Sequence, residues 1–389
     1  MKKIGIISEL NMDNVNYGNK LQAFALNRYL NNTFKCEAES IIIDNKLDAK
    51  KSTLKGVHKY TNKVKKIPKK LKETFKNIIL KFNKKKYNFD KRREACNIFV
   101  KNNIKLCKGL INLKNITKTN YDVFITGSDV VWAQVNGGVN RIKFLNFNTN
   151  KKFEKIAYAP SFGKDWIPKE NIDTIKDFLS AFNAISVREK SSVEMLKNIG
   201  INNVEHVCDP TLLLSKKEWE NIEQKIYIKD KYIFVYLLGK NKEQREKIKE
   251  LAKKLNLMII DIPHANGEFN KVDEGFGDYS IDNCSPEEWI WLIHNAEYII
   301  TDSFHGVVFS TIFNKKFFVL KRYYTENINN RMLDYLNTIG ESDKMIDVQN
   351  LKSVKDFEWN YDKINFKLEE FVNNSKNYLN ENINKKISV

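Results

Sequence analysis

The feature that most constrains the fold of this chain is a regular alternation of short apolar runs with longer stretches of helical periodicity. Each apolar run has the length of a strand and ends in polar residues or glycine. Short buried strands alternating with helices are typical of a parallel sheet covered by helices on both faces. The pattern therefore predicts an α/β protein. The predicted strands are "KIGIISE", "ESIIID", "YDVFITG", "KIAYAPSFG", "AISVRE", "VEHVCDPTLLL", "KYIFVYLLG", "LMIIDI", "EYIITDSFHG" and "KKFFVL".

The alternating pattern occurs as two similar sets, separated by a charged stretch at residues 215–230. At 389 residues the chain exceeds what one hydrophobic core usually serves. We therefore predict an N-terminal α/β domain over 1–220, with a basic helical segment at 50–110, and a C-terminal α/β domain over 221–389. Both are expected to be Rossmann-like, with parallel sheets that face each other across a cleft. The last helical stretch is expected to pack back on the first domain.

Several classes of protein are disfavoured by the sequence. No stretch approaches the ~20 apolar residues of a membrane-spanning helix, and the start "MKKIGIISEL" predicts a first strand, not a signal peptide. A cytoplasmic protein is therefore expected. The five cysteines form no C-x-x-C pair and the five histidines show no H-x-H or H-E-x-x-H spacing. Neither a disulfide framework nor a metal site is predicted, and the sequence requires no cofactor.

The positive charge of the chain is concentrated in one segment. Residues 50–93 hold eighteen lysines and arginines and two acidic residues, out of a net charge of +18 for the whole chain. Apolar residues recur there at spacings of three and four, which indicates an amphipathic helix. One interpretation is a peripheral contact with an anionic membrane surface at the inner face of the cell membrane. The other is a solvated helix packed on its own domain. No nucleic-acid-binding motif accompanies the charge, so no nucleic acid is expected.

Common nucleotide-binding and hydrolase motifs are absent. No G-x-G-x-x-G follows a strand, and neither a G-x-x-x-x-G-K-[ST] loop nor a G-x-S-x-G elbow occurs. What remains is a set of polar residues at the carboxyl ends of predicted strands, where open α/β sheets bind ligands.

Two of these polar groups belong to the predicted first domain. "NYGN" provides Asn16, Tyr17, Gly18 and Asn19 at a helix start, where glycine lets backbone approach a ligand and the helix favours an anion. "GSDVVW" provides Ser128, Asp129 and Trp132 after a buried strand. Asp129 suits a sugar hydroxyl or a general base, and Trp132 suits the apolar face of a sugar. Ordinary turn and capping roles are the alternatives for both groups.

Two further groups of polar residues contain a side chain that is positively charged or can become protonated. Arg188 follows an apolar strand and precedes a helix, which suits bidentate binding of an anion, with a salt bridge to Glu189 as the alternative. The cluster Asp302, Ser303, His305 and Gly306 lies at a strand-to-helix turn, with Arg331 downstream. A histidine at the second position of a helix suits general acid–base chemistry, and simple capping by Ser303 is the alternative.

Six of these motifs, in their order along the chain, resemble the polysaccharide pyruvyltransferase family. They are "NYGNKLQAFAL", "FITGSDVVW", "AYAPSFG", "ISVREKSSVEML", "CDPTLLL" and "TDSFHGVVFSTIFNKKFFVL". The resemblance covers roughly residues 3–340 and is weakest over the basic segment. The chain departs from the common "GSDQVW" form at Val130, which puts the acceptor role of that motif in doubt.

The resemblance implies a fold like that of GT-B glycosyltransferases and phosphoenolpyruvate as the donor substrate. Family members attach pyruvate as a ketal across two hydroxyls of a sugar in a cell-surface glycan, with release of phosphate. The arginine of "SVRE" and the histidine of "SFHG" bind the donor in the family, and they correspond here to Arg188 and His305. Such acceptors are often lipid-linked oligosaccharides. The sequence carries no signal for the oligomeric state.

The chemistry of the donor agrees with the residues themselves. Phosphoenolpyruvate carries a phosphate and a carboxylate, which Arg188, a helix amino terminus and Arg331 would bind. Our hypothesis makes His305 the main proton-transfer group or phosphate partner, and Asp129 or Asp302 its helper on the acceptor side, with Ser303 and Gly306 lining the donor. Two alternatives remain: a GT-B glycosyltransferase with a nucleotide-sugar donor, and a non-catalytic protein that binds anionic glycan or lipid.

Overall fold

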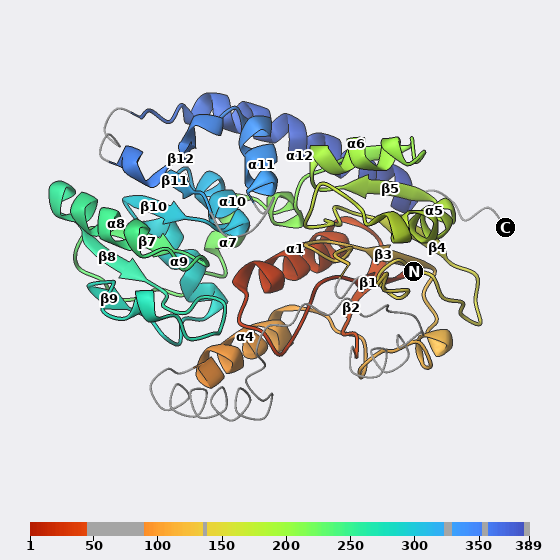
Figure 1. The fold of residues 1–389 in the computed structure, drawn as a ribbon. Coiled ribbons are helices and arrows are strands. Elements are labelled where there is room, and N and C mark those ends of the chain that lie inside the picture. Colours follow the sequence, from red (N-terminus) through yellow and green to blue (C-terminus); the bar gives the residue numbers. More distant parts are fainter. Residues whose placement is uncertain (45–88, 135–137, 323–328, 352–356, 385–389) are drawn as a thin grey trace, which may run out of the picture.

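The computed structural model describes residues 1–44, 89–134, 138–322, 329–351 and 357–384 (Figure 1). The predicted amphipathic helix and its membrane contact fall mainly on residues 45–88 and so lie outside the described residues. Of the segment 50–110, the structure shows one helix, α4 (Phe89–Asn103). In the described part of the chain no helix has the length and apolar character needed to cross a bilayer.

The first sheet contains six parallel strands in the order β2-β1-β3-β4-β5-β6. Its strands are β1 (Lys2–Ile7), β2 (Cys36–Ile41), β3 (Val123–Thr126), β4 (Glu154–Ala157), β5 (Ala184–Val187) and β6 (Val204–His206). Helices α1 (Tyr17–Thr33), α4, α5 (Ile172–Ser180) and α6 (Lys190–Asn198) connect them. β3 is buried along its whole length, as expected for a parallel strand covered on both faces.

The second sheet is also six-stranded and parallel, in the order β12-β11-β10-β7-β8-β9. Its strands are β7 (Tyr232–Tyr236), β8 (Met258–Asp261), β9 (Tyr279–Ser280), β10 (Tyr298–Thr301), β11 (Lys316–Leu320) and β12 (Met345–Ile346). Its helices are α8 (Lys242–Leu255), α9 (Pro286–Asn295), α10 (Phe304–Ile312) and α11 (Asn330–Ile339). The short helices η4 (Pro210–Leu213) and α7 (Lys216–Glu220) lie between the two sheets in the sequence.

Each sheet has one point where the direction of its strand order reverses. In the first sheet this point lies between β1 and β3, where Ile7 is paired with Thr126. In the second it lies between β7 and β10, where Tyr236 is paired with Thr301. Open α/β sheets bind ligands in the crevice beyond such a reversal. The segments that leave these four strands contain most of the polar groups singled out in the sequence.

The two halves share an extensive buried junction. One continuous apolar cluster includes residues of both sheets, from Ile4 in β1 to Phe317 in β11. Across the junction the Tyr17 ring stacks on Trp289, with ring centroids 5.6 Å apart, and the Tyr17 hydroxyl donates to the Cys284 carbonyl at 2.9 Å. The halves are therefore held in one arrangement by packing and by hydrogen bonds together.

Arg92 of α4 adds a second polar connection between the halves. Its side chain is 1% exposed and donates to three carbonyl oxygens of the second half. They belong to Asp282 at 2.6 Å, Pro263 at 3.0 Å and His264 at 3.3 Å. A guanidinium suits this task because its donors form a rigid fork.

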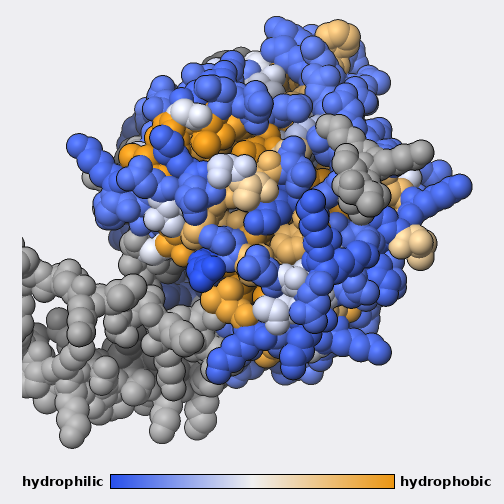
Figure 2. All heavy atoms as spheres, turned by 90° about the vertical axis from the view of Figure 1, so that its right-hand side faces the viewer, coloured by the Kyte–Doolittle hydropathy of each residue, from blue (hydrophilic) through white to orange (hydrophobic). Residues whose placement is uncertain are grey.

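The last helix, α12 (Tyr361–Asn384), returns to the first domain along the top of the molecule as drawn in Figure 1. The Tyr378 hydroxyl donates to the Ala157 carbonyl of β4 at 2.8 Å, and the Ser375 hydroxyl accepts from the Cys208 amide at 2.8 Å. The Lys2 ammonium of β1 donates to the Ile383 carbonyl at 2.6 Å. The face of the first domain seen in Figure 2 is mainly hydrophilic, with apolar side chains showing between the charged ones.

Candidate active site at the domain junction

His305 is the second residue of α10, immediately beyond β10. Ser303 caps this helix, and its hydroxyl accepts from the Gly306 amide. A side chain at position 306 is excluded, because a β-carbon there would lie 2.5 Å from the Thr301 hydroxyl. The turn thus places His305 at the start of the helix, where the sequence predicted it.

Arg188 leaves the end of β5 and is 5% exposed. Its guanidinium lies near three carboxylates: Glu189 at 2.9 Å, Asp209 at 3.0 Å and Asp129 at 3.5 Å. Burial alone would lower the pKa of Arg188, but the three carboxylates outweigh it and raise the pKa. The guanidinium also lies over the ring of Phe304, 4.2 Å from its centroid, which is a cation–π contact between the domains.

Asp209 connects Arg188 to His305 and was not singled out in the sequence. It is 1% exposed and caps η4 by accepting from the Thr211 amide at 3.0 Å. The same residue lies 3.5 Å from Nε2 of His305. Burial opposes its ionisation, yet the neighbouring His305 and Arg188 hold its pKa well below the usual range. Asp209 is therefore an ionised carboxylate that lies between the two predicted donor-binding residues, hydrogen-bonded to Arg188 and 3.5 Å from Nε2 of His305.

Unused hydrogen-bond donors remain in this cluster. Within the described residues, Nη2 of Arg188 and Nε of Arg331 are buried and have no hydrogen-bond partner. Arg331 is the second residue of α11, and its pKa is lowered by burial and by the nearby charge of Arg188. Buried donors are normally satisfied, so these two N–H groups are available to a ligand with acceptor oxygens.

Asp302 occupies a different environment from the one expected of a group that handles substrate. It is fully buried, and its two oxygens accept from the amides of Leu238 and Gly239, each at 2.7 Å. The side chain of Arg322 lies 3.2 Å away. Its carboxylate thus fixes the segment that follows β7, at the strand-order reversal of the second sheet.

The "NYGN" group supports the site from the first domain. Asn16 is exposed and caps α1, and its side chain accepts from the Asn19 amide. Asn19 in turn accepts from the Asn11 amide, and Tyr17 is buried in the junction. Gly18 lies against His305. These contacts are those of a scaffold, with the Asn16 side chain as the exposed member of the group.

Lys20 follows this group and was missed by the sequence interpretation, although "NYGNK" contains it. Its side chain is buried, and its ammonium donates to the Asn11 carbonyl and to Asn14. Burial lowers the pKa of Lys20 to about 8. A lysine in the first turns of a helix gave no sequence signal for burial, because lysines of that kind are usually exposed.

The "GSDVVW" group divides between the site and the core. Asp129 is 7% exposed and lies beside Arg188, as described above. Ser128 is fully buried, and its hydroxyl donates to the Ala159 carbonyl at 3.0 Å. Trp132 is also fully buried and stacks on Phe144 with ring centroids 5.0 Å apart. Trp132 is therefore a core residue in this structure and has no ring face available to a sugar.

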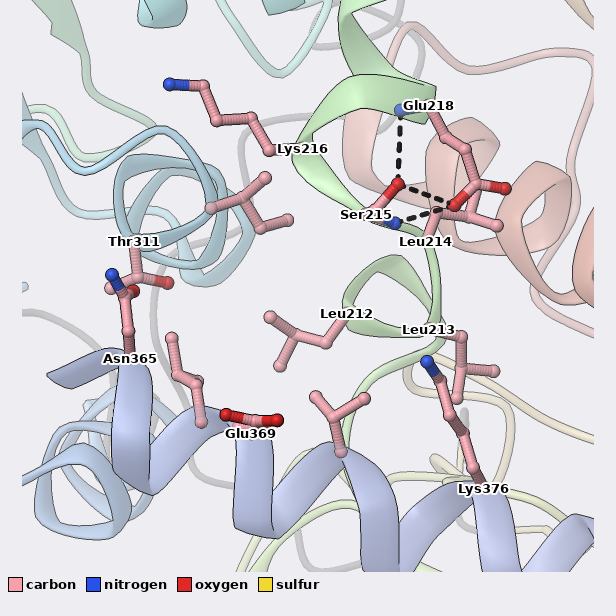
Figure 3. Close-up of a pocket in the computed structure, with 13 residues that line it drawn as sticks. Leu212, Leu213, Leu214, Ser215, Lys216, Glu218, Thr311, Asn365, Glu369 and Lys376 are labelled. Atoms are coloured by element: carbon pink, nitrogen blue, oxygen red, sulfur yellow. Dashed lines mark hydrogen bonds between the residues drawn. The ribbon is translucent and has the colours of Figure 1, made fainter. Parts of the chain in front are cut away.

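A cavity of about 240 Å³ lies elsewhere, between η4, α7, the end of α10 and α12 (Figure 3). Its floor is apolar, with Leu212, Leu368 and Val372, and Lys216 and Lys376 line it as well. None of the cluster residues lines it. Among the described residues, no group of three or more His, Cys, Asp or Glu side chains is arranged to hold a metal ion.

The family model for polysaccharide pyruvyl transferases matches residues 16–322. The chain belongs to this family. The match includes Arg188, Asp209 and His305 and ends before Arg331. The resemblance seen in the sequence motifs is thereby confirmed. No protein in the curated collection matches the chain.

Solved structures show the same fold at low identity. The Staphylococcus aureus MnaA–UDP structure is 14% identical, with a TM-score of 0.51, and the match covers 98% of this chain and 97% of that one. A Methanocaldococcus jannaschii UDP-GlcNAc 2-epimerase in complex with UDP-GlcNAc and UDP is 13% identical (TM-score 0.43; 96% and 93% covered). The E. coli heptosyltransferase WaaC with ADP is 11% identical (TM-score 0.39; 89% and 92%). With the two parallel sheets, the MnaA likeness confirms the predicted GT-B-like fold.

Proposed function

We propose that this protein transfers pyruvate from phosphoenolpyruvate to a sugar of a cell-surface polysaccharide or its lipid-linked precursor, as a ketal across two hydroxyls. The observation that carries the proposal is a pair of buried N–H groups without a hydrogen-bond partner, Nη2 of Arg188 and Nε of Arg331, in the cluster where Asp209 links Arg188 to His305. Membership in the pyruvyl transferase family supplies the reaction class.

The cluster suits a small ligand with two anionic groups. Phosphate and carboxylate oxygens accept hydrogen bonds from guanidinium N–H groups and from the first amides of a helix. Nη2 of Arg188, Nε of Arg331 and the start of α10 offer such donors within one region. Phe304 covers one face of the Arg188 guanidinium and excludes water from it, which strengthens the electrostatic interactions there.

The reaction needs three proton transfers, one to the donor's methylene carbon and one from each of the two sugar hydroxyls. Protonation of the donor's methylene carbon converts it to a methyl group and leaves an oxocarbenium-like centre at the neighbouring carbon, which the first sugar hydroxyl attacks. The second hydroxyl then displaces phosphate at the same carbon, and both hydroxyl protons are lost. We assign the proton-transfer role to His305, oriented by Asp209. This assignment follows from its place at the start of α10, where Asp209 links it to Arg188.

On the acceptor side, Asp129 is the better candidate of the two aspartates. Asp302 already accepts two backbone hydrogen bonds and is fully buried, so we assign it a positioning role. Asp129 is the most exposed of the three carboxylates around Arg188. We propose that it accepts a proton from a sugar hydroxyl, and that the exposed Asn16 contributes to the acceptor surface.

The proposal is tested by calorimetric titration of phosphoenolpyruvate into the wild-type protein, His305→Asn and Arg331→Gln. Arg141→Gln is a matched control, because Arg141 is exposed and lies outside the cluster. We expect binding to the wild type and the control, and weaker binding to both cluster variants. Once an acceptor is found, His305→Asn should lower turnover by about 10²- to 10⁴-fold. Thermal stabilisation by nucleotide sugars, with no binding of phosphoenolpyruvate, would overturn the proposal.

A further inference from the structure

In the part of the chain that the structure describes, the residues of the donor cluster include no aromatic ring face open to a sugar. Trp132, the aromatic residue that the sequence suggested for that purpose, is fully buried. Of the six tryptophans in the chain, five are buried or partly buried, and only Trp166 is exposed, at 45%. Single exposed apolar residues are common on protein surfaces, so the exposure of Trp166 has meaning only through its position.

The loop that holds Trp166 is paired with the segment that holds Asp129. The Ser161 amide donates to the Asp129 carbonyl at 2.8 Å, and Asp129 and Pro160 form a parallel bridge. Farther along the loop, Gly163 adopts a φ of +72° and a β-carbon there would touch Val130 at 3.2 Å. The loop therefore starts beside Asp129 and turns sharply at Gly163, before Trp166.

The same loop is tied to the helix that holds Arg331. The Asn330 side-chain amide donates to Asp165 at 2.9 Å. Asp165 precedes Trp166, and Asn330 precedes Arg331. The hydrogen bond between Asp165 and Asn330 therefore joins the two segments next to the tryptophan and the arginine. One turn of α11 later, Asp334 accepts from the amide and the hydroxyl of Ser191 at 3.0 and 2.7 Å. Helix α11 is thus held against the first half of the chain at two points, the Trp166 loop and α6.

Exposure increases along a path from the donor cluster to Trp166. Asp209 and Arg188 are 1% and 5% exposed, Arg331 and Asn330 are partly exposed, and Asp165 and Trp166 are exposed. The path thus leads from the buried donor cluster to the protein surface at Trp166.

We propose that Trp166 is the platform for the acceptor, a hexopyranoside whose apolar ring face packs on the indole. The ammonium of Lys164 lies 4.4 Å from the centroid of the indole ring and supports it by a cation–π contact. A rigid, amphipathic aromatic side chain gives a large contact area at little cost in conformational entropy. The inference rests on the proposed function, since it takes the Arg188 cluster to be the donor site.

The test uses the full-length protein labelled with 5-fluorotryptophan, with the Trp166 resonance assigned from Trp166→Phe. Methyl α- and β-glycosides of glucose, galactose, mannose and N-acetylglucosamine are added at millimolar concentrations, with and without phosphoenolpyruvate. We expect at least one glycoside to shift the Trp166 resonance. Ligand-observed binding of that glycoside should weaken about tenfold in Trp166→Ala and be largely retained in Trp166→Phe.

Tyr227→Ala is the matched control, because Tyr227 is a 78% exposed aromatic residue with a lysine beside its ring, in the segment before β7. It should bind the glycoside like the wild type. Glycoside binding that leaves the Trp166 resonance unmoved, or no binding of any glycoside in the panel, would overturn the proposal. If glycosides shift the resonance while phosphoenolpyruvate does not bind the wild type, the proposed reaction fails and the sugar platform stands.

Discussion

The imidazole of His305 lies directly against the backbone of Gly18. A β-carbon added at Gly18 would fall 2.0 Å from Nδ1 and 2.3 Å from Cγ of the ring. One residue comes from the first turn of α1 and the other from the first turn of α10, so the contact spans the domain junction. The His305 ring thus leaves no room for a side chain at position 18, which explains the glycine there.

Gly18→Ala should therefore displace His305. We expect phosphoenolpyruvate affinity to fall at least tenfold and the free energy of unfolding to fall by about 1–3 kcal/mol, the usual cost of overpacking. Calorimetry and denaturant unfolding measure the two effects. Gly138→Ala is the control, because a β-carbon there meets no atom within 4 Å. Wild-type binding by Gly18→Ala would contradict the role given to this contact.

Asp209→Asn should remove the charge that holds Arg188 and His305. We expect a loss of about 3 kcal/mol in the free energy of unfolding near neutral pH, as for other broken buried ion pairs. The pKa of Asp209 is lowered in the folded state, so its stabilisation is present above the ordinary aspartate pKa of about 3.9 and is lost as the pH falls further. Unfolding of both proteins by denaturant from pH 7 down to pH 3 should show the difference shrinking in acid. A difference independent of pH would argue against the ion pair.

Asp261 should destabilise the protein at alkaline pH. It lies at the end of β8, and burial raises its pKa to about 7 in spite of a hydrogen bond from Ser280 at 2.5 Å. The unfolded chain ionises near pH 4, so folding stability falls as the pH rises from about 4 to about 7 and stays reduced above it. Asp261→Asn should therefore raise the free energy of unfolding at pH 8 by up to about 4 kcal/mol.

The gain from Asp261→Asn should disappear near pH 4, where the wild-type carboxyl is already protonated in both states. Denaturant unfolding at pH 8, 6 and 4 measures this trend. Asp278→Asn is a nearby control, because Asp278 is exposed and its carboxylate accepts from the Ile259 amide. A constant effect of Asp261→Asn across these pH values would show that its charge is not the cause.

Arg92→Lys should weaken the junction between the halves. A lysine ammonium cannot reach three carbonyl oxygens in the geometry of a guanidinium fork, so buried carbonyls lose their donors. We expect a loss of about 2–4 kcal/mol by thermal or denaturant unfolding. Arg93→Lys, on the same helix but exposed, should change stability little. Equal stability of the two variants would mean that apolar packing alone holds the junction.

The sequence predicted the sheets well because parallel strands carry a local signal. All ten predicted strands are present, and the two that were missed, β9 and β12, have two residues each. A pair of residues shows no periodicity, and such strands form only because a neighbouring strand offers hydrogen-bond partners. Arg188 and His305 were also found, since each follows a strong apolar run.

The remaining parts of the site depend on contacts that no local pattern encodes. Asp209 precedes a proline, and such a pair signals a turn, while its partners Arg188 and His305 are far away in the sequence. Trp132 follows a polar group, yet Phe144 and Phe162 enclose it. Trp166 lies in a loop whose place is set by Asn330, on the other half of the chain. Contacts between segments that are distant in the sequence therefore determine the surroundings of Asp209, Trp132 and Trp166.

The return of α12 to the first sheet affects the order in which the protein can fold during its synthesis. The hydroxyl of Tyr378 reaches β4 and the ammonium of Lys2 holds Ile383, so the opening half of the chain is covered by its last helix. During synthesis on the ribosome, the first half of the chain therefore stays incompletely covered while the second half emerges. Only after α12 has emerged can the first half acquire the contacts that Tyr378 and Ile383 make with it.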